Sequence, residues 1–377
     1  MNIFLLTETK SGCYKWRGAI PAKYLRRRGH NVQVFDAGEA PEAPDVMVLY
    51  RAHYVEAVKL LAWCRRYGIR VVFDTDDALD LVPPENLNYR AVQERIDLYE
   101  VLLQAADVVT TTTETLAAHL RNFNRNVVVV PNSVDPEEWT VAPRRDEIRV
   151  GWTGSPTHFT DLALALDAIR ELQKKRDFLL VLQGICSEPT LDELFETLLI
   201  RHGRKFFDTP IGRAIKHFRD KLEGVRYEFH PNVPLEQHPA KVCDLALDVG
   251  IAPLVDSPFN HHKSCIKYYE YAMAGAVTLA SHVLPYSTEV PLTAKNKRDT
   301  WKQKLEWILE QDRQSLWREQ RDWVMANRNI ETTVEQWERV LAGDPAPQVM
   351  TPARDETPSI RQDFDPQAAV PSAIAST

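Results

Sequence analysis

Two lysines and a glutamate at helical spacing are the residues of this chain best suited to hold a phosphate-containing ligand. Lys263, Lys267 and Glu270 stand at positions i, i+4 and i+7, so they share one face of a helix. Two cations can neutralise a pyrophosphate, and a carboxylate one turn further along can bind ribose hydroxyls. Ordinary ion pairing on a solvated helix face is the alternative that the spacing alone leaves open.

The chain before these residues is expected to place them at the start of that helix. An apolar strand over residues 245–251 leads through a loop, 256–262, into a helix over 264–274 that Ser264 can cap. A helix N-terminus offers free N–H groups and the positive end of the helix dipole. The spacing therefore predicts an anion site at this helix start, with Lys263 at its entrance.

A second polar loop follows the strand expected over residues 148–152. Gly154 would let the backbone approach a phosphate closely, because glycine has no Cβ. Ser155, His158 and Asp161 come next and could reach the same ligand. The alternatives are a helix cap for Ser155 and a plain surface position for His158.

Three aspartates, Asp74, Asp76 and Asp77, close a buried strand expected over residues 70–73. Carboxylates so close together raise one another's pKa and often act as bases or bind cations. A phosphatase-type nucleophile and acid pair is a rival interpretation, but Ala78 stands where such enzymes carry threonine or valine. A metal-binding D-x-D motif is a further interpretation, but it is typical of a fold with one sheet domain, and the tandem pattern of this chain argues against it. A cluster that only caps a turn is the last possibility.

The loop between the first strand and the first helix, residues 9–18, contains two glycines and is a weak phosphate loop. Gly12 and Arg17 are its candidate ligand-binding residues. Arg17 could equally be a surface charge.

Strands alternate with helices along most of the chain, which predicts α/β architecture with parallel sheets and helices on both faces. The pattern stops at a segment rich in proline and charge, residues 131–147, and then restarts. The expected arrangement is two tandem Rossmann-like, doubly wound domains that face a cleft, with ligands beyond the carboxyl ends of the strands. Strands are expected at 2–6, 32–35, 46–50, 70–73, 108–111, 127–130, 148–152, 178–183, 225–229, 245–251 and 277–281.

The expected domains have boundaries that follow this pattern. Residues 1–145 form the first domain and residues 146–325 the second. A helix at 326–343 returns to the first domain, and a proline-rich tail at 344–377 is expected to be disordered. Residues 190–222 are two charged helices inserted at the surface of the second domain.

Composition excludes several classes of protein. The net charge is −7, which disfavours a nucleic-acid binder. Five cysteines, with no C-x-x-C pair among them, argue against a disulfide framework or a structural zinc site. We find no apolar stretch of membrane-spanning length and no signal-peptide pattern, so we expect a cytoplasmic protein.

The stretch 259–271 carries a specific resemblance. It resembles the donor-binding segment of retaining GT-B glycosyltransferases, the large family 4, in a branch with the pattern F-N-x-x-K-S-x-x-K-Y-x-E-Y. Residues 152–161 are similar to that family's G-x-G-S-x-x-H-x-x-D loop, and 74–77 to the D-x-D-D of the branch. The likeness extends over residues 1–290. The first pattern is matched by Phe259, Asn260, Lys263, Ser264, Lys267, Tyr268, Glu270 and Tyr271.

The resemblance implies a GT-B fold and transfer of a sugar from a nucleotide-sugar substrate, with retention and without a metal or other cofactor. It implies that Lys263 binds donor phosphate and Glu270 the donor ribose, and that the D-x-D-D aspartates lie on the acceptor side. Our hypothesis for the base that takes the acceptor proton is Asp76 or Asp77. His158 joins the expected catalytic residues. Further donor-binding residues expected are Gly12, Arg17, Gly154, Ser155, Asn260, Ser264 and Lys267.

Two departures from the family pattern keep other functions open. His262 replaces the first glutamate of the family's E-x7-E signature, and residues 290–301 lack its glycine-rich turn. A degenerate module that binds a nucleotide without turnover is therefore one alternative. A phage-type enzyme that glycosylates modified nucleobases is another. The acceptor is open among glycan, protein, lipid and modified base.

Overall fold

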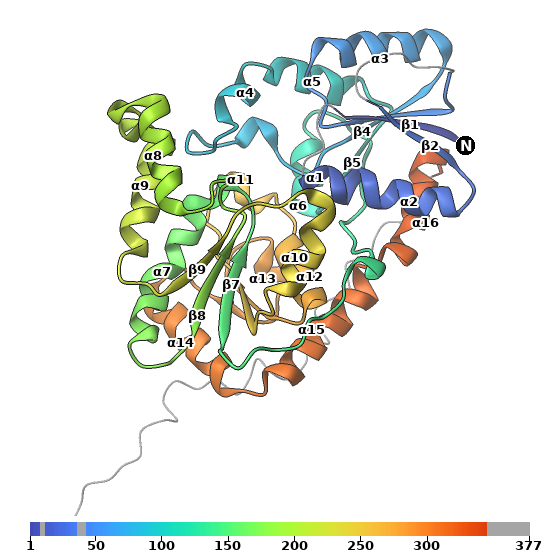
Figure 1. Cartoon of the computed structure of the whole chain (residues 1–377). Helices are drawn as coiled ribbons and strands as arrows, with labels where there is room; N and C mark the ends of the chain where they lie inside the picture. Colours follow the sequence, from blue (N-terminus) through green and yellow to red (C-terminus); the bar gives the residue numbers. More distant parts are fainter. Residues whose placement is uncertain (8–11, 36–42, 345–377) are drawn as a thin grey trace, which may run out of the picture. The chain divides into compact units, whose positions relative to one another are not determined.

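The computed structural model describes residues 1–7, 12–35 and 43–344. Most of the predicted tail, and the first residues of the 9–18 loop, lie outside these described residues. Within them, two parallel six-stranded sheets form the centre of the two halves of the chain (Figure 1).

The first sheet has the strand order β2-β1-β3-β4-β5-β6, with every pairing parallel. Successive side chains of β1 go to opposite faces. Ile3 and Leu5 pack in the cluster that contains α2 and α16 residues, whereas Phe4 and Leu6 pack with α3 and α5. The strands are β1 (Asn2–Leu6), β2 (Asn31–Phe35), β3 (Val46–Tyr50), β4 (Arg70–Asp74), β5 (Val108–Thr111) and β6 (Val127–Val129).

The second sheet has the order β12-β11-β10-β7-β8-β9, again all parallel. Counted from its first strand, this is the 3-2-1-4-5-6 order of a Rossmann fold, and the order reverses between β7 and β10. Ligands of such sheets bind at that reversal. The strands are β7 (Arg149–Thr153), β8 (Leu179–Gln183), β9 (Tyr227–His230), β10 (Val249–Ala252), β11 (Val277–Ser281) and β12 (Thr293–Ala294).

The helices of the first half, with short turns between them, are α1 (Gly12–Tyr14), α2 (Ile20–Arg27), α3 (Val55–Tyr67), α4 (Tyr89–Gln93), α5 (Ile96–Ala105) and α6 (Glu114–Leu120). Those of the second half are α7 (Phe159–Gln173), α8 (Leu191–His202), α9 (Pro210–Leu222), α10 (His238–Asp244), α11 (Pro258–His261), α12 (Ile266–Ala274) and α13 (Tyr286–Glu289). The last three are α14 (Arg298–Glu310), α15 (Arg313–Asn327) and α16 (Ile330–Ala342).

The sequence pattern predicted most of these elements closely. The strand expected at 245–251 begins only at Val249, and β12 was not expected. The pattern of residues 89–105 also predicts a single long helix, which is wrong, because Arg95 leaves helical geometry at φ −130° and separates α4 from α5. The cap expected from Ser264 is also wrong. The residue before α12 is Cys265, which makes no capping hydrogen bond, and Ser264 accepts a hydrogen bond from Asn132 instead.

The last helix, α16, begins at Ile330 rather than at residue 326, and it packs against the first half of the chain. In α16, Trp337, Val340 and Leu341 are buried in the same cluster as Ile3 and Leu25. The segment between the two halves of the chain also contacts the start of α16, because Val134 forms a parallel β-bridge with Asn329. Among the described residues, no helix is long and apolar enough to cross a membrane.

A buried ion pair connects the first helical turn to β4. The Arg17 guanidinium donates to both carboxylate oxygens of Asp74, at 3.1 and 2.7 Å. Its NH1 donates to the carbonyl of Val130 at 2.5 Å and to the side chain of Asn132 at 3.3 Å. Both charged side chains are fully buried, so each charge depends on the other.

We predict that Asp74→Asn lowers the free energy of unfolding by about 3–5 kcal/mol, because it leaves the Arg17 charge buried without its counter-ion. Urea unfolding measures the loss. The matched control is Glu94→Gln, which neutralises the partner of Arg90 in an ion pair whose side chains are 91% and 62% exposed. It should cost less than about 0.5 kcal/mol. Equal losses in the two variants would contradict this prediction.

Candidate functional site

An ion pair joins the loop after β10 to the carboxyl end of β4. The Nζ of Lys263 lies 3.4 Å from Oδ1 of Asp77 and 4.4 Å from the ring centre of Phe259. Phe259 itself is buried in the cluster that contains Leu79 of the first half. The loop predicted to hold a donor phosphate therefore meets the predicted acid cluster directly.

Arg51 holds the two carboxylates of this cluster together. Its NH1 lies 3.3 Å from an oxygen of Asp76 and 3.3 Å from one of Asp77. Arg51 directly follows β3 and has a φ of 45°, in the left-handed region that a residue with a side chain seldom occupies. Strain of this kind costs on the order of 1–3 kcal/mol and is concentrated at functional sites.

The surroundings of Asp76 and Asp77 shift their pKa values in opposite directions. Burial raises the pKa of Asp76, and the attraction of Arg51 offsets only part of that effect. Burial opposes ionisation of Asp77 as well, but Lys263 and Arg51 together hold the pKa of that carboxyl below its usual value. Asp77 is thus the ionised member of the pair, and Asp76 takes up a proton more readily.

The thiol of Cys13 completes this cluster. Its sulfur and the carboxylates of Asp76 and Asp77 lie within 4.8 Å of one another. Burial, followed by the charge of Asp76, raises the pKa of Cys13 far above its usual value, so the thiol stays protonated. These groups are metal ligands by type, but Arg51 and Lys263 supply positive charge to the same carboxylates. That charge disfavours a divalent cation.

The side chain of Lys267, a residue of α12, reaches the end of β7, beside the loop that contains Gly154. Its Nζ donates to the carbonyl of Thr153 at 2.6 Å and sits 4.6 Å from the ring centre of Trp152. Burial lowers the pKa of Lys267 to about 8, and the attraction of Glu270 offsets only part of this effect. A Cβ on Gly154 would lie 2.5 Å from the Trp152 ring and 2.7 Å from Nζ, so only glycine fits.

Glu270 is presented as an ionised acceptor. Its Oε1 lies 3.1 Å from Nε2 of His238, the first residue of α10. Burial raises the pKa of Glu270, but His238 and Lys267 lower it further than burial raises it. The carboxylate therefore keeps its charge in a buried position, which suits the predicted contact with ribose hydroxyls.

Asp161 organises the loop after β10. Its Oδ2 accepts from Nδ1 of His158 at 2.8 Å, and its Oδ1 accepts from the backbone N–H of Val255 at 2.7 Å and from the Asn260 amide at 3.3 Å. Asn260 also donates to the carbonyl of Val255 at 3.0 Å. Both predicted ligand-binding side chains, Asp161 and Asn260, thus fix the loop that carries Lys263.

His158 is held as a neutral ring. Burial lowers its pKa and the charge of Lys267 lowers it further, while the hydrogen bond to Asp161 opposes both effects. A neutral ring that donates from Nδ1 carries its lone pair at Nε2. His158 can therefore accept a hydrogen bond at neutral pH.

The remaining predicted site residues lie in different surroundings. Arg17 is 1% exposed and paired with Asp74, so it acts from the interior. Ser264 binds Asn132 at 2.8 Å. Gly12 is exposed, with no atom near its Cβ position, and the exposed Ser155 hydroxyl is bonded to that of Thr157 at 3.0 Å.

Sequence reasoning missed three participants, namely Arg51, Cys13 and His238. Arg51 could have been found, because it directly follows the predicted strand 46–50, at the edge where ligands were expected. Cys13 stands next to the candidate Gly12 in the predicted loop. No sequence signal links His238 to Glu270, which is 32 residues further along the chain.

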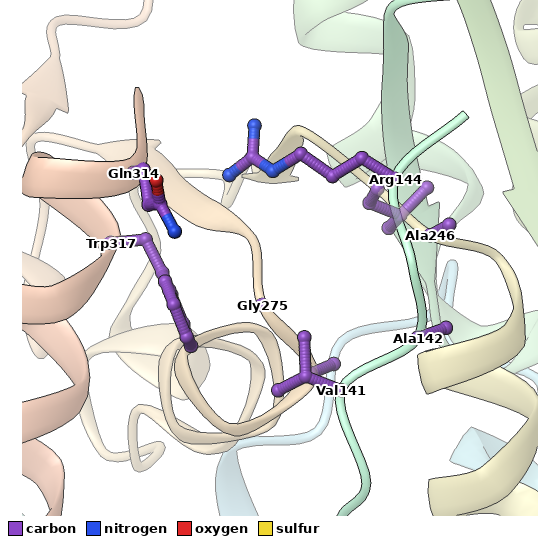
Figure 2. Close-up of a pocket in the computed structure, with 9 residues that line it drawn as sticks. Val141, Ala142, Arg144, Ala246, Gly275, Gln314 and Trp317 are labelled. Carbon is purple, nitrogen blue, oxygen red and sulfur yellow. The ribbon is translucent and has the colours of Figure 1, made fainter. Parts of the chain in front are cut away.

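A cavity of about 220 Å³ lies away from these residues (Figure 2). Ala246 and Leu247 in its wall precede β10, and Gly275 precedes β11, so it opens at the amino ends of these strands. Linker residues form another part of the wall, and Trp317 and Gln314 come from α15. The candidate site, at the carboxyl ends, does not include this cavity.

Comparison with known proteins gives no match in sequence and many in structure. No protein-family model matches the chain, and no curated protein sequence matches it. Solved structures match over nearly the whole chain. A glycosyltransferase from Rickettsia africae ESF-5 superimposes with a TM-score of 0.61 at 12% identity, over 91% of this chain and 98% of that one.

Two further similar structures contain nucleotides. Anabaena Alr3699/HepE in complex with UDP-glucose has a TM-score of 0.64 at 12% identity, over 91% of this chain and 100% of that one. An alpha-glucosyltransferase in complex with UDP and a 13-mer DNA containing an HMU base has a TM-score of 0.61 at 13% identity, over 91% and 99%. At this identity the likeness concerns the fold. The chain has the GT-B architecture that the sequence predicted.

Proposed function

We propose that this chain is a glycosyltransferase that moves a sugar from a nucleotide-sugar donor to a hydroxyl group of an acceptor. The observation that supports this most strongly is the contact of Lys263 with Asp77, because it unites a cationic, phosphate-type loop with an acid pair. The fold adds support, since structures that share it bind UDP and UDP-glucose. Uridine diphosphate sugars are therefore the donors to test first.

The proposed reaction breaks the bond between the anomeric carbon and the donor diphosphate and forms a bond from that carbon to the acceptor oxygen. Negative charge grows on the leaving diphosphate. Lys263, Lys267 and the uncapped N-terminus of α12 would neutralise it. Glu270 would bind the ribose, and the acceptor proton would pass to Asp76 or Asp77.

Binding of the diphosphate would itself prepare the base. Lys263 now lowers the pKa of Asp77. A phosphate that draws Lys263 away would let that pKa rise, so Asp77 would become a stronger base when the donor is in place. Donor binding and proton acceptance are coupled in this way through a single ion pair.

Retention of the anomeric configuration and independence from metal belong to this proposal and are supported by the family resemblance. The charge that Arg51 and Lys263 place on the two carboxylates supports catalysis without metal. A cytoplasmic location remains a prediction from the sequence.

Glycosylation of a nucleobase in DNA is a second candidate function. It is favoured by the structural likeness to an alpha-glucosyltransferase bound to DNA with an HMU base. The net charge of −7 disfavours it. Salt-dependent retention of the protein on duplex DNA separates the two candidates, because phosphate contacts weaken steeply as salt rises.

We predict that UDP stabilises the wild-type protein by about 2.7 kcal/mol at 100 times its dissociation constant. Lys263→Ala and Glu270→Ala should abolish most of this gain, because they remove the proposed phosphate and ribose contacts. A thermal-shift panel of nucleoside diphosphates and nucleotide sugars measures the effect. Lys302→Ala and Glu306→Ala, in α14, are matched controls and should keep the full shift.

The outcomes of this panel separate the remaining alternatives. The absence of a shift with every nucleotide would overturn the proposed function. A shift that needs Lys263 and Glu270, combined with no transfer to any acceptor, would instead support the degenerate nucleotide-binding module.

We predict that affinity for UDP falls as the pH rises through 8. Lys267 has a pKa of about 8, so it is charged below that pH and loses its charge above it. If the diphosphate needs that charge, the dissociation constant should rise by up to about tenfold per pH unit between pH 8 and 9. Titration calorimetry at pH 7 to 9 measures it. Lys267→Arg stays charged and should give a flatter profile; equal slopes in both proteins would contradict the role of Lys267.

We predict that Asp76→Asn or Asp77→Asn reduces kcat by about a hundredfold to ten-thousandfold, because loss of a general base has effects of this size. Affinity for UDP should not fall in Asp77→Asn, since Lys263 loses a competing partner. Nucleoside diphosphate release measures turnover. Near-normal rates in both variants would refute the assignment of a base to this pair, and loss of wild-type transfer in excess EDTA would refute metal independence.

A further inference from the structure

The insertion between β8 and β9 forms a helical hairpin on the outer side of the second half (Figure 1). It consists of α8, the short turn Arg204–Asp208 and α9. Ile215, Phe218 and Leu222 of α9 are buried, and α9 packs against α7. Arg219 lies over the ring of Phe195 in α8, at 4.7 Å. The hairpin is therefore a folded part of the second half.

The hairpin is basic in an acidic chain. Residues 191–222 contain seven basic residues and five acidic ones, a net charge of +2 in a chain whose net charge is −7. The connection between the two helices is its most basic part, because Arg201, Arg204 and Lys205 stand there with no acidic residue between them. The basic residues are Arg201, Arg204, Lys205, Arg213, Lys216, Arg219 and Lys221.

Most of these cations are not used by the fold. Lys221 pairs with Asp167, and Arg213 donates to the carbonyl of Asp208. Arg219 is exposed but lies over the ring of Phe195. The other four cations are also exposed, and within the part of the chain that the structure describes they make no ion pair. These four are Arg201, Arg204, Lys205 and Lys216.

Apolar side chains stand among these cations. Ile200 is 85% exposed, the highest value among the exposed large apolar residues of the described chain. Leu199, its neighbour in the last turn of α8, is 43% exposed. They are the two residues before Arg201, and the fold leaves Ile200 almost uncovered. Burying a side chain of this size stabilises a complex by roughly 1.5–3 kcal/mol, so a partner that covered both would gain from them.

We propose that this hairpin docks on an anionic lipid surface. Leu199 and Ile200 would enter the boundary between headgroups and acyl chains, and the four unpaired cations would contact lipid phosphates. Charge complementarity alone would also suit a nucleic acid, but a phosphate backbone would leave Ile200 uncovered. The apolar pair therefore favours lipid. This inference does not depend on the proposed enzymatic activity.

The test is co-flotation of the whole protein with vesicles of phosphatidylcholine, alone or with 30% phosphatidylserine. We expect the wild type to float with the anionic vesicles at low salt and to stay in solution with the neutral ones. Arg201→Gln, Arg204→Gln and Lys205→Gln combined should weaken binding about a hundredfold, since each cation near such a surface contributes a factor of about five. Leu199→Ser combined with Ile200→Ser should weaken binding at every salt concentration.

The controls change charge or apolar surface elsewhere. Lys59→Gln, Lys174→Gln and Lys175→Gln combined remove the same charge from other exposed positions, and Tyr67→Ser removes a side chain that is 59% exposed. Both should float as the wild type does, and the melting temperature of every variant should stay close to the wild-type value. The proposal is overturned if the wild type does not float with anionic vesicles, or if the hairpin triple variant and the control triple variant lose binding equally. It is also overturned, in favour of a nucleic-acid partner, if the wild type binds duplex DNA but not vesicles and the hairpin triple variant loses that DNA binding.

Discussion

The buried pair of Arg17 and Asp74 is the interaction on which the candidate site depends. Asp74 ends β4, so the pair fixes the point from which Asp76 and Asp77 continue. The same guanidinium reaches Asn132 in the linker, and Asn132 donates to Ser264 just before α12. One chain of hydrogen bonds thus runs from the first sheet to the start of the helix that carries Lys267 and Glu270. Arg17, Asp74 and Asn132 are buried, so water does not compete readily for their hydrogen bonds.

Strand order explains why the site residues converge. The second sheet reverses between β7 and β10, and the loops that leave these strands carry Gly154 and Lys263. In the first sheet the order reverses between β1 and β3, and Arg51 directly follows β3. In each sheet, a charged residue therefore lies close to the point where the strand order reverses. The contact of Lys263 with Asp77 joins the two sets.

The sequence was sufficient for the fold and for the grouping of Lys263, Lys267 and Glu270, because both depend on local pattern. Alternating apolar runs predicted the strands, and the i, i+4, i+7 spacing placed Lys263, Lys267 and Glu270 together near α12. Contacts between distant segments left no such signal. His238 beside Glu270, and Arg17 inside rather than at the surface, follow from packing of whole elements. The positive φ of Arg51 could not be predicted from the sequence either, because arginine seldom adopts that backbone conformation.

The two lysines of the proposed anion site differ in how their surroundings affect their charge. Burial would lower the pKa of Lys263, but Asp77 and the other acidic groups nearby together raise it above its usual value, so Lys263 stays charged and its charge is already engaged. Lys267 makes no ion pair among the described residues, and burial lowers its pKa to about 8. A diphosphate would have to displace Asp77 from the first lysine, and by its own charge it would raise the pKa of the second. The site would therefore reach its full positive charge only in the presence of the anion it is proposed to bind.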